Sequence, residues 1–407
     1  MDLKRVKIAY HDHGKKMWLI RASGGKYINH FRQSGIVTIG HLDDIYDHRE
    51  VGVEDIPTQE KIEQILLRNP DYSKPINSTS KRRKLSQSGT SKLQQIAAFK
   101  NIKKGDLIVS VDADYLMIGI CNEDSPYLDG DPVKIAVPEG QQRNRKEYPS
   151  LKQRMRRSVT WGPSLSRYRL PSAIKKTFQG RRTVISLDKH WDKFLHLIYP
   201  FFVDDDNLYI SNRIGTNAPI NNLIISGFLQ NVALTQIIAE SFVEKEKIDL
   251  DYLYEVLSLG IDLAGLDSTS KAEFMSPGDI WSRIPLNNVS DKASYIIGCV
   301  LVSLILSGHT SIAELIDEAG VSTATQKYVA PTSMADDIFT PPKKKKRQGA
   351  IVAEIKSQAA VLNALKEQRK SSLINKKLTL SLPNVDTQGL ESIEHGIPVA
   401  KVVSDAQ

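Results

Sequence analysis

Short apolar runs separated by polar loops fill the first half of the chain, whereas apolar positions recur at helical spacing in the second half. Apolar runs of about four to eight residues between turn-forming residues are typical of β-strands. The pattern therefore predicts strands at 16–21, 36–39, 106–111, 115–121, 133–137 and 156–161. Apolar residues at helical spacing predict two helices inserted between these strands, at 58–68 and 92–100.

The pattern changes near residue 193. The segment Asn221–Glu246 repeats apolar residues at helical spacing, and it follows Ala218-Pro219, where a proline is typical of a helix start. Further helices are predicted at 250–259, 290–306 and 310–319, with one strand at 208–211. The sequence therefore predicts a mainly α-helical domain over 193–335. We expect this domain to be an interaction or effector module through which the chain could form homo-oligomers.

The last part of the chain, 336–407, predicts a basic linker, an amphipathic helix and a flexible tail. The segment Pro331–Gly349 contains the run Pro341–Arg347, PPKKKKR, which is typical of a nuclear-localisation signal or of a charged linker. Apolar residues recur at helical spacing within Ile351–Lys370, and the last 25 or so residues show little packing pattern.

Length and charge extend this division. A chain of 407 residues exceeds the roughly 250–300 residues that one hydrophobic core usually serves, so we expect an α+β protein with domains at 1–192, 193–335 and 336–407. Residues 1–200 hold 36 Lys and Arg against 22 Asp and Glu, a net charge of +14. Residues 201–342 hold 7 against 19, net −12, and residues 343–407 hold 12 against 6, net +6. A basic first domain favours a polyanionic partner such as nucleic acid.

Other features narrow the class of protein. Two cysteines, Cys121 and Cys299, cannot form a disulfide framework, and no His/Cys cluster has zinc spacing, so no metal or cofactor is predicted. The longest apolar run, Ala293–Ser307, is shorter than the roughly 20 residues of a membrane-spanning helix, which favours a buried helix over a membrane span. The charged start, Met1–Arg5, is not typical of a signal peptide, which predicts a cytoplasmic protein.

The first domain also carries a family pattern. The string WLIRASGGKY at 18–27, then Phe31, then GIVTIG at 35–40 resembles the opening of the EVE-like branch of the PUA superfamily, found in modification-dependent and Mrr-like restriction proteins. Three further blocks are similar to that family in the same order, at 94–109, 118–120 and 157–161. The resemblance covers about residues 10–190 and implies a β-barrel-type domain with helical insertions. His41 departs from the family, which often has tryptophan there.

The resemblance implies a nucleic-acid-binding domain that holds a flipped, modified base, with DNA favoured over RNA and restriction or anti-phage defence as the setting. Aromatic faces restore the stacking that a flipped base loses. The implied stacking residues are Trp18, Phe31 and Trp161, with His41 in the pocket wall. Arg21 would contact a base edge or phosphate, and Gly24 and Gly25 would let the backbone approach the ligand. Phosphate contacts are expected from Lys26, Lys81, Arg82, Arg83, Lys84, Arg154, Arg156 and Arg157.

Structural alternatives stay open for the same residues. Trp18 and Trp161 lie in apolar strands and are equally compatible with a hydrophobic core, and for Phe31 the core is favoured. Gly24-Gly25 is also compatible with a simple turn, and the cluster 81–84 with a solvated loop.

Catalysis is undecided from the sequence. Glu354-Ile355-Lys356 matches the Asp/Glu-x-Lys part of a metal-dependent nuclease site, but it lies in a predicted helix without a spaced aspartate before it. No phosphate-binding glycine loop or hydrolase motif is present. Two alternatives to a DNA sensor therefore remain: a divergent metal-dependent restriction nuclease with its site in 193–335, and an RNA-binding accessory protein.

Overall fold

The computed structural model describes residues 6–43, 45, 56–77, 81–136, 149–170, 172–180, 182–244, 253, 268–273, 277–286, 291–310, 320–322 and 353–403. The chain forms two compact units. The curved-sheet unit comprises residues 14–191 and 386–396, and the helix-covered unit comprises 1–13, 192–385 and 397–407. One division between the units falls near residue 192, but both ends of the chain join the helix-covered unit and neither unit is continuous in sequence.

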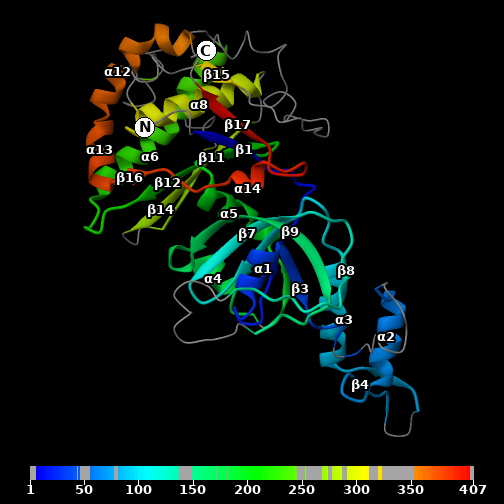
Figure 1. Ribbon diagram of the computed structural model, residues 1–407. Coiled ribbons are helices and arrows are strands. Elements are labelled where there is room, and N and C mark those ends of the chain that lie inside the picture. The colour runs from blue at the N-terminus through cyan, green and yellow to red at the C-terminus, as the bar shows by residue number, and fades with distance from the viewer. Residues whose placement is uncertain are drawn as a thin grey trace. The chain divides into compact units, whose positions relative to one another are not determined.

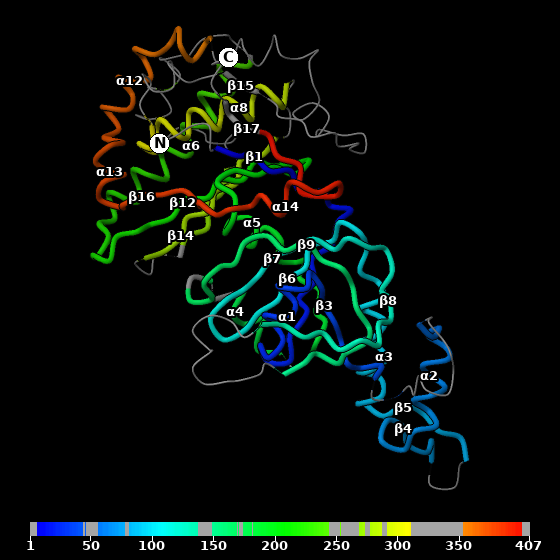
Figure 2. The backbone as a smooth tube through the Cα atoms, in the orientation of Figure 1, coloured from blue at the N-terminus to red at the C-terminus, as the bar shows by residue number. Residues whose placement is uncertain are grey.

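The curved-sheet unit is a mixed α+β structure around a sheet of order β10-β2-β6-β7-β9-β3, with β8 paired to β9. Figure 2 shows these strands curling into a half-barrel. Its strands are β2 (Met17–Ile20), β3 (Ile36–Ile39), β6 (Leu107–Val111), β7 (Tyr115–Cys121), β8 (Tyr127–Leu128), β9 (Met155–Ser166) and β10 (Val184–Ser186). Its helices outside the insertion are α1 (Ile28–Ser34), α4 (Ser172–Thr177) and α14 (Gln388–Glu391).

The long strand β9 produces the curl. Its first part pairs with β3, from Met155 to Ser158, and its later part pairs with β7 up to Ser166. The register between β7 and β9 shifts between Met117 and Gly119. A Cβ at Gly119 would lie 2.6–2.8 Å from atoms of β9, so only glycine lets the strands meet this closely. Such irregularities bend a strand and increase its twist.

An insertion of two helices and a hairpin extends from this sheet. It consists of α2 (Gln59–Arg68), β4 (Ser73–Pro75), β5 (Arg83–Leu85) and α3 (Gln87–Lys100), and Figure 1 shows α3 leading from the sheet toward α2 and β4. The Thr58 side chain caps α2, and the Ser86 side chain caps α3 by accepting from the Gly89 N–H. The helices α2 and α3 bury Ile62, Leu66, Ile96 and Phe99 in the core of the unit.

The helix-covered unit contains a second sheet, of order β13-β14-β12-β11-β1-β17-β15, with β16 paired to β12. Its strands are β1 (Lys7–Tyr10), β11 (Phe201–Val203), β12 (Asn207–Ile214), β13 (Thr269–Glu273), β14 (Gly278–Pro285), β15 (Gly320–Ser322), β16 (Leu380–Ser381) and β17 (Val399–Val403). Its helices are α5 (Trp191–Ile198), α6 (Asn222–Glu244), α8 (Lys292–Leu306), α12 (Ala359–Gln368) and α13 (Ser371–Leu378). The sequence prediction for 193–335 missed most of this sheet, because β11 to β15 all lie in that range and only the strand at 208–211 was expected. Strands β1, β16 and β17 come from outside the range.

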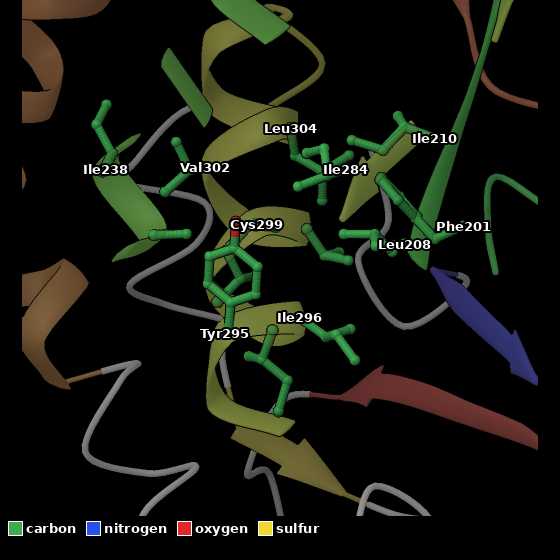
Figure 3. Packing of buried hydrophobic residues seen from close by; sticks show 14 of the residues in the cluster. Phe201, Leu208, Ile210, Ile238, Ile284, Tyr295, Ile296, Cys299, Val302 and Leu304 are labelled. Carbon is green, nitrogen blue, oxygen red and sulfur yellow. The ribbon is translucent and has the colours of Figure 1, made fainter. Parts of the chain in front are cut away.

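Helix α8 forms the centre of that unit. Every residue from Ala293 to Leu306 is buried, and Figure 3 shows its side chains against Phe201, Leu208 and Ile284 of the sheet. A helix that is apolar all round belongs in a protein core or a membrane. The segment Asn222–Val243 of α6 is long and apolar enough to cross a membrane, but half of it is buried within the structure, as in a core helix.

The end of the chain also differs from its prediction. The expected amphipathic helix is confirmed by α12, which buries Leu362 and Leu365. The expected flexible tail is wrong for the described residues up to 403, since Leu390 of α14 is fully buried and β17 pairs with β1. The linker Pro331–Gly349 with its lysine run lies outside the described residues.

Candidate nucleic-acid interface

Arg157 of β9, predicted to contact phosphate, is fully buried. Its guanidinium donates to the carbonyl oxygens of Phe99 (3.0 Å), Lys100 (2.9 Å) and Glu123 (3.0 Å). Burial lowers the pKa of Arg157. The phosphate role is therefore corrected to a structural one, because the donors of this side chain already join α3 and the segment after β7 to the sheet.

Arg156 is corrected in the same way. It is 3% exposed and bonds to the carboxylate of Asp129 and the carbonyl of Asp131. The third arginine of this strand region, Arg154, is half-buried, and its backbone N–H donates to the Asp43 carboxylate. Of these three arginines, only Arg154 keeps a partly exposed side chain.

The three predicted stacking residues gather in the core rather than around an open pocket. Phe31 is fully buried, and Trp18 is 8% exposed with its indole N–H donating to Asp106 Oδ2 at 2.9 Å. Trp161 is half-buried, and its indole N–H donates to the Phe31 carbonyl at 2.7 Å. All three pack in or against one apolar cluster, so stacking by Trp18 and Phe31 is corrected to core packing.

The Gly24-Gly25 turn approaches the protein's own backbone. Ser23, Gly24 and Gly25 all have left-handed φ values, of 51°, 69° and 92°. A Cβ at Gly25 would lie 2.7 Å from the Asp112 Cβ, whereas one at Gly24 would meet nothing within 4 Å. Glycine at position 25 therefore lets this turn pack on the turn between β6 and β7. Lys26, which follows, is exposed.

Arg21 and His41 lie near the segment that leads into β10. Arg21 donates to the carbonyls of Arg182 (3.0 Å) and Phe178 (2.5 Å). Burial, and then the positive charge of Arg167, lower the pKa of Arg21. His41 Nε2 lies 3.5 Å from the Thr183 hydroxyl oxygen.

The β4–β5 hairpin carries the predicted cluster at 81–84. Lys81, Arg82 and Lys84 are exposed, while Arg83 donates to the hydroxyl and carbonyl of Ser73. In the antiparallel register Lys74 lies directly opposite Lys84. Within the described part of the chain, no ion pair joins Lys74, Lys81 or Lys84 to a carboxylate.

The hairpin also exposes an apolar side chain among these charges. Ile76, which follows β4, is 50% exposed. Its backbone N–H donates to the Arg82 carbonyl, which adds a hydrogen bond beyond the paired residues of β4 and β5. The hairpin thus presents a group of exposed cations on a short, hydrogen-bonded frame.

Charge is unevenly shared between the two units. The curved-sheet unit holds 32 Lys and Arg against 22 Asp and Glu, net +10, while the helix-covered unit holds 23 against 25, net −2. Two stretches more than account for this excess: 72–105 has nine Lys and Arg, 148–187 has ten, and neither contains an acidic residue. The second stretch is a signal that sequence reasoning missed, and it includes Arg167, Tyr168 and Lys175.

The described residues do not bring together a set of side chains that would form a nuclease site. Glu354 and Lys356 lie on a helical segment, and Glu354 bonds within that segment to Gln358. No group of three or more His, Cys, Asp or Glu residues that could hold a metal ion is found over the same ranges. The predicted nuclease therefore stays a prediction.

Comparison with known proteins gives no match: no family model, no curated protein and no solved structure is significantly similar to this chain.

Proposed function

We propose that the curved-sheet unit binds nucleic acid, with DNA favoured, and that the β4–β5 hairpin supplies its main phosphate contacts. The observation that carries the proposal is the cross-strand pair Lys74–Lys84, which has no carboxylate partner in the described chain. Like charges directly opposite each other destabilise a β-ladder. A phosphate between them converts that repulsion into attraction, so the pair is best explained by an anionic partner.

Exposure and charge support the same interface. Lys81 and Arg82 extend the cation pair along the loop, and the 72–105 stretch offers no acidic residue to oppose a polyanion. Phosphate contacts of this kind position a nucleic acid without reading its sequence. The hairpin therefore accounts for affinity, and sequence or base preference must come from other residues.

The wider context is part of the proposal. The half-barrel sheet is compatible with a PUA-like barrel, and the sequence blocks at 18–40, 94–109 and 157–161 resemble EVE-like domains. On that resemblance we propose a cytoplasmic DNA sensor in restriction or anti-phage defence that prefers modified bases. Its homo-oligomerisation through the helix-covered unit belongs to the same proposal. Since Trp18 and Phe31 are buried, base recognition requires a different surface from the predicted one.

The proposal is tested by measuring how affinity depends on salt. The triple variant Lys74→Gln, Lys81→Gln, Lys84→Gln removes three exposed charges from the hairpin, and fluorescence anisotropy with a labelled duplex reports binding from 50 to 300 mM salt. Removing one lysine–phosphate contact lowers the slope of log K against log salt by about one, so we expect a decrease of about 2–3. Affinity at low salt should fall about tenfold or more.

A matched control removes the same charge elsewhere. Lys356, Lys376 and Lys377 are exposed in the helix-covered unit, and Lys→Gln at all three leaves the hairpin intact. If the two triple variants weakened binding equally, affinity would depend only on the net charge of the protein, and the proposal would be contradicted. Duplexes with and without 5-methylcytosine, and an RNA of matched length, then distinguish the modified-DNA sensor from the RNA-binding alternative.

A further inference from the structure

We propose that a second surface of the curved-sheet unit holds an unpaired nucleotide, with its base against Tyr168 or Tyr115 and its phosphate near Arg167 and Arg21. This inference rests on the proposed function, because it assumes a bound nucleic acid. It keeps Arg21 from the family resemblance, adds Arg167 and the two tyrosines, and replaces the predicted pocket of buried aromatics with an exposed surface.

The exposed aromatic rings carry the inference. Tyr168 is 77% exposed and Tyr115 is 53% exposed, so a partner in solution can reach both rings. Both lie at one end of the β7–β9 pair, since Tyr115 is opposite Ser166 in the register. The Tyr168 hydroxyl lies 3.5 Å from Asp114 Oδ1, next to Tyr115 in the chain. The two rings therefore belong to one surface.

Two fixed arginines lie beside these rings. Arg167 donates from Nη1 to the Asp112 carbonyl at 2.7 Å, and its guanidinium carbon lies 5.7 Å from the centre of the Phe178 ring. Arg21 donates to the Phe178 carbonyl, so both guanidinium groups meet at Phe178. In the described structure both are held by carbonyl oxygens, and no ion pair to a carboxylate is found for either. Their positive charges thus remain available to a phosphate.

The frame of this surface is already ordered. Asp112 Oδ1 accepts from the backbone N–H groups of Asp114 and Tyr115, at 2.8 and 2.6 Å, and the Gly25 turn packs against Asp112. Lys175 adds a further cation, and its Nζ donates to the Tyr168 carbonyl at 3.1 Å. A surface that is fixed before binding spends little conformational entropy when a ligand is placed on it.

The chemistry selects unpaired bases. Bases inside a duplex already stack on their neighbours, so only a single-stranded, bulged or flipped base can offer a free face to a tyrosine ring. Stacking accepts any base, because every base has a π-face. Hence the hairpin would hold strands of any kind, whereas the tyrosine surface would add affinity only for strands with an unpaired nucleotide.

The test uses the full chain and three labelled probes: single-stranded dT15, a 15-bp duplex, and the same duplex with a two-nucleotide bulge. Tyr168→Ala should weaken binding of dT15 and of the bulged duplex about fivefold or more, while the intact duplex changes by less than about twofold. Tyr168→Phe keeps the ring and should bind all three probes like the wild type. Tyr115→Ala repeats the measurement on the neighbouring ring.

The outcomes separate this inference from the proposed function. If the wild type binds in a salt-dependent, hairpin-dependent way but Tyr168→Ala and Tyr115→Ala alter all probes equally or none, the tyrosine surface is wrong and the interface at the hairpin stands. If the wild type binds none of the probes, both fail. The same tyrosine dependence with rU15 in place of dT15, at tighter affinity, supports the surface and makes RNA the source of the unpaired nucleotide.

Discussion

Two basic regions of the curved-sheet unit, the start of β9 and the β4–β5 hairpin, were both expected to contact phosphate, and the structure shows that their side chains have different surroundings. On β9, Arg156 and Arg157 are buried and bonded to carbonyl and carboxylate oxygens. On the β4–β5 hairpin, Lys81 and Lys84 are exposed, and Lys84 lies opposite another lysine, Lys74, instead of an acid. The difference shows that basic residues within one basic unit can take two different places, and that the acceptors around each side chain decide whether it is buried or stays exposed.

Replacing Arg157 by leucine is expected to have the largest effect and would test the structural half of this comparison. The change leaves three carbonyl oxygens, of Phe99, Lys100 and Glu123, without their donor inside the protein. Each buried unsatisfied group costs about 1–3 kcal/mol, so we expect a loss of about 3 kcal/mol or more in the free energy of unfolding. Urea unfolding followed by circular dichroism measures it.

Lys84→Gln is the matched control, because it removes a cation from the exposed region of the same unit. Its effect on the free energy of unfolding should stay within about 0.5 kcal/mol. Arg157→Lys keeps the charge but not the planar set of donors, and it should lie between the two. If Arg157→Leu unfolded at the same urea concentration as Lys84→Gln, the division between buried and exposed basic regions would be wrong.

The strands that were predicted well are those whose pattern is local. The segments 36–39 and 115–121 match β3 and β7 at both ends, and 58–68 matches α2 together with its capping residue Thr58. The predicted strand 133–137 is not formed in its described part, where Val133 makes only a single bridge with Leu151. There the apolar spacing was present, but no neighbouring strand extended it.

Other elements depend on partners far away in the chain, which a local pattern does not reveal. Strand β1 pairs with β11 in parallel and with β17 in antiparallel fashion, so it joins segments some 190 and 390 residues away. The predicted phosphate contact at Arg157 was wrong for the same reason. The carbonyl oxygens that accept from Arg157 come from α3 and from the segment after β7, which are distant in sequence. The sequence shows that the stretch 148–187 contains no acidic residue. It does not show which side chains of that stretch are exposed.

The comparison extends to His11 of the helix-covered unit, a basic side chain kept neutral by burial. It is 7% exposed, and burial, then the neighbouring His13, lower its pKa to about 3. The unfolded chain binds a proton near pH 6.5, whereas the folded one does not, so stability is complete above that pH and falls as pH decreases toward 3. At pH 5 the loss should be about 2 kcal/mol. Urea unfolding at pH 7.5 and 5 measures it.

The variant His11→Gln separates this residue from other buried histidines. His309, whose pKa burial lowers to about 4, contributes acid sensitivity in the same direction and is unchanged in the variant. His11→Gln should therefore retain part of the decrease between pH 7.5 and 5, with the His11 share removed. If the free energy of unfolding depended on pH identically in wild type and variant, His11 would bind its proton equally well in the folded and unfolded chain, and the predicted pKa shift would be wrong.

The smallest effect tests the exposed half of the comparison. Lys84→Glu places a carboxylate opposite Lys74 and turns a repulsive cross-strand pair into an attractive one. Such pairs contribute about 0.2–1 kcal/mol, so amide hydrogen exchange in a peptide spanning 70–90 should slow by about two- to fivefold. The same variant should bind a DNA duplex more weakly than Lys84→Gln, because a carboxylate repels phosphate. If exchange did not slow, the two lysines would not oppose each other in solution, and the electrostatic reason for an anionic partner at this hairpin would disappear even if other basic residues still bound DNA.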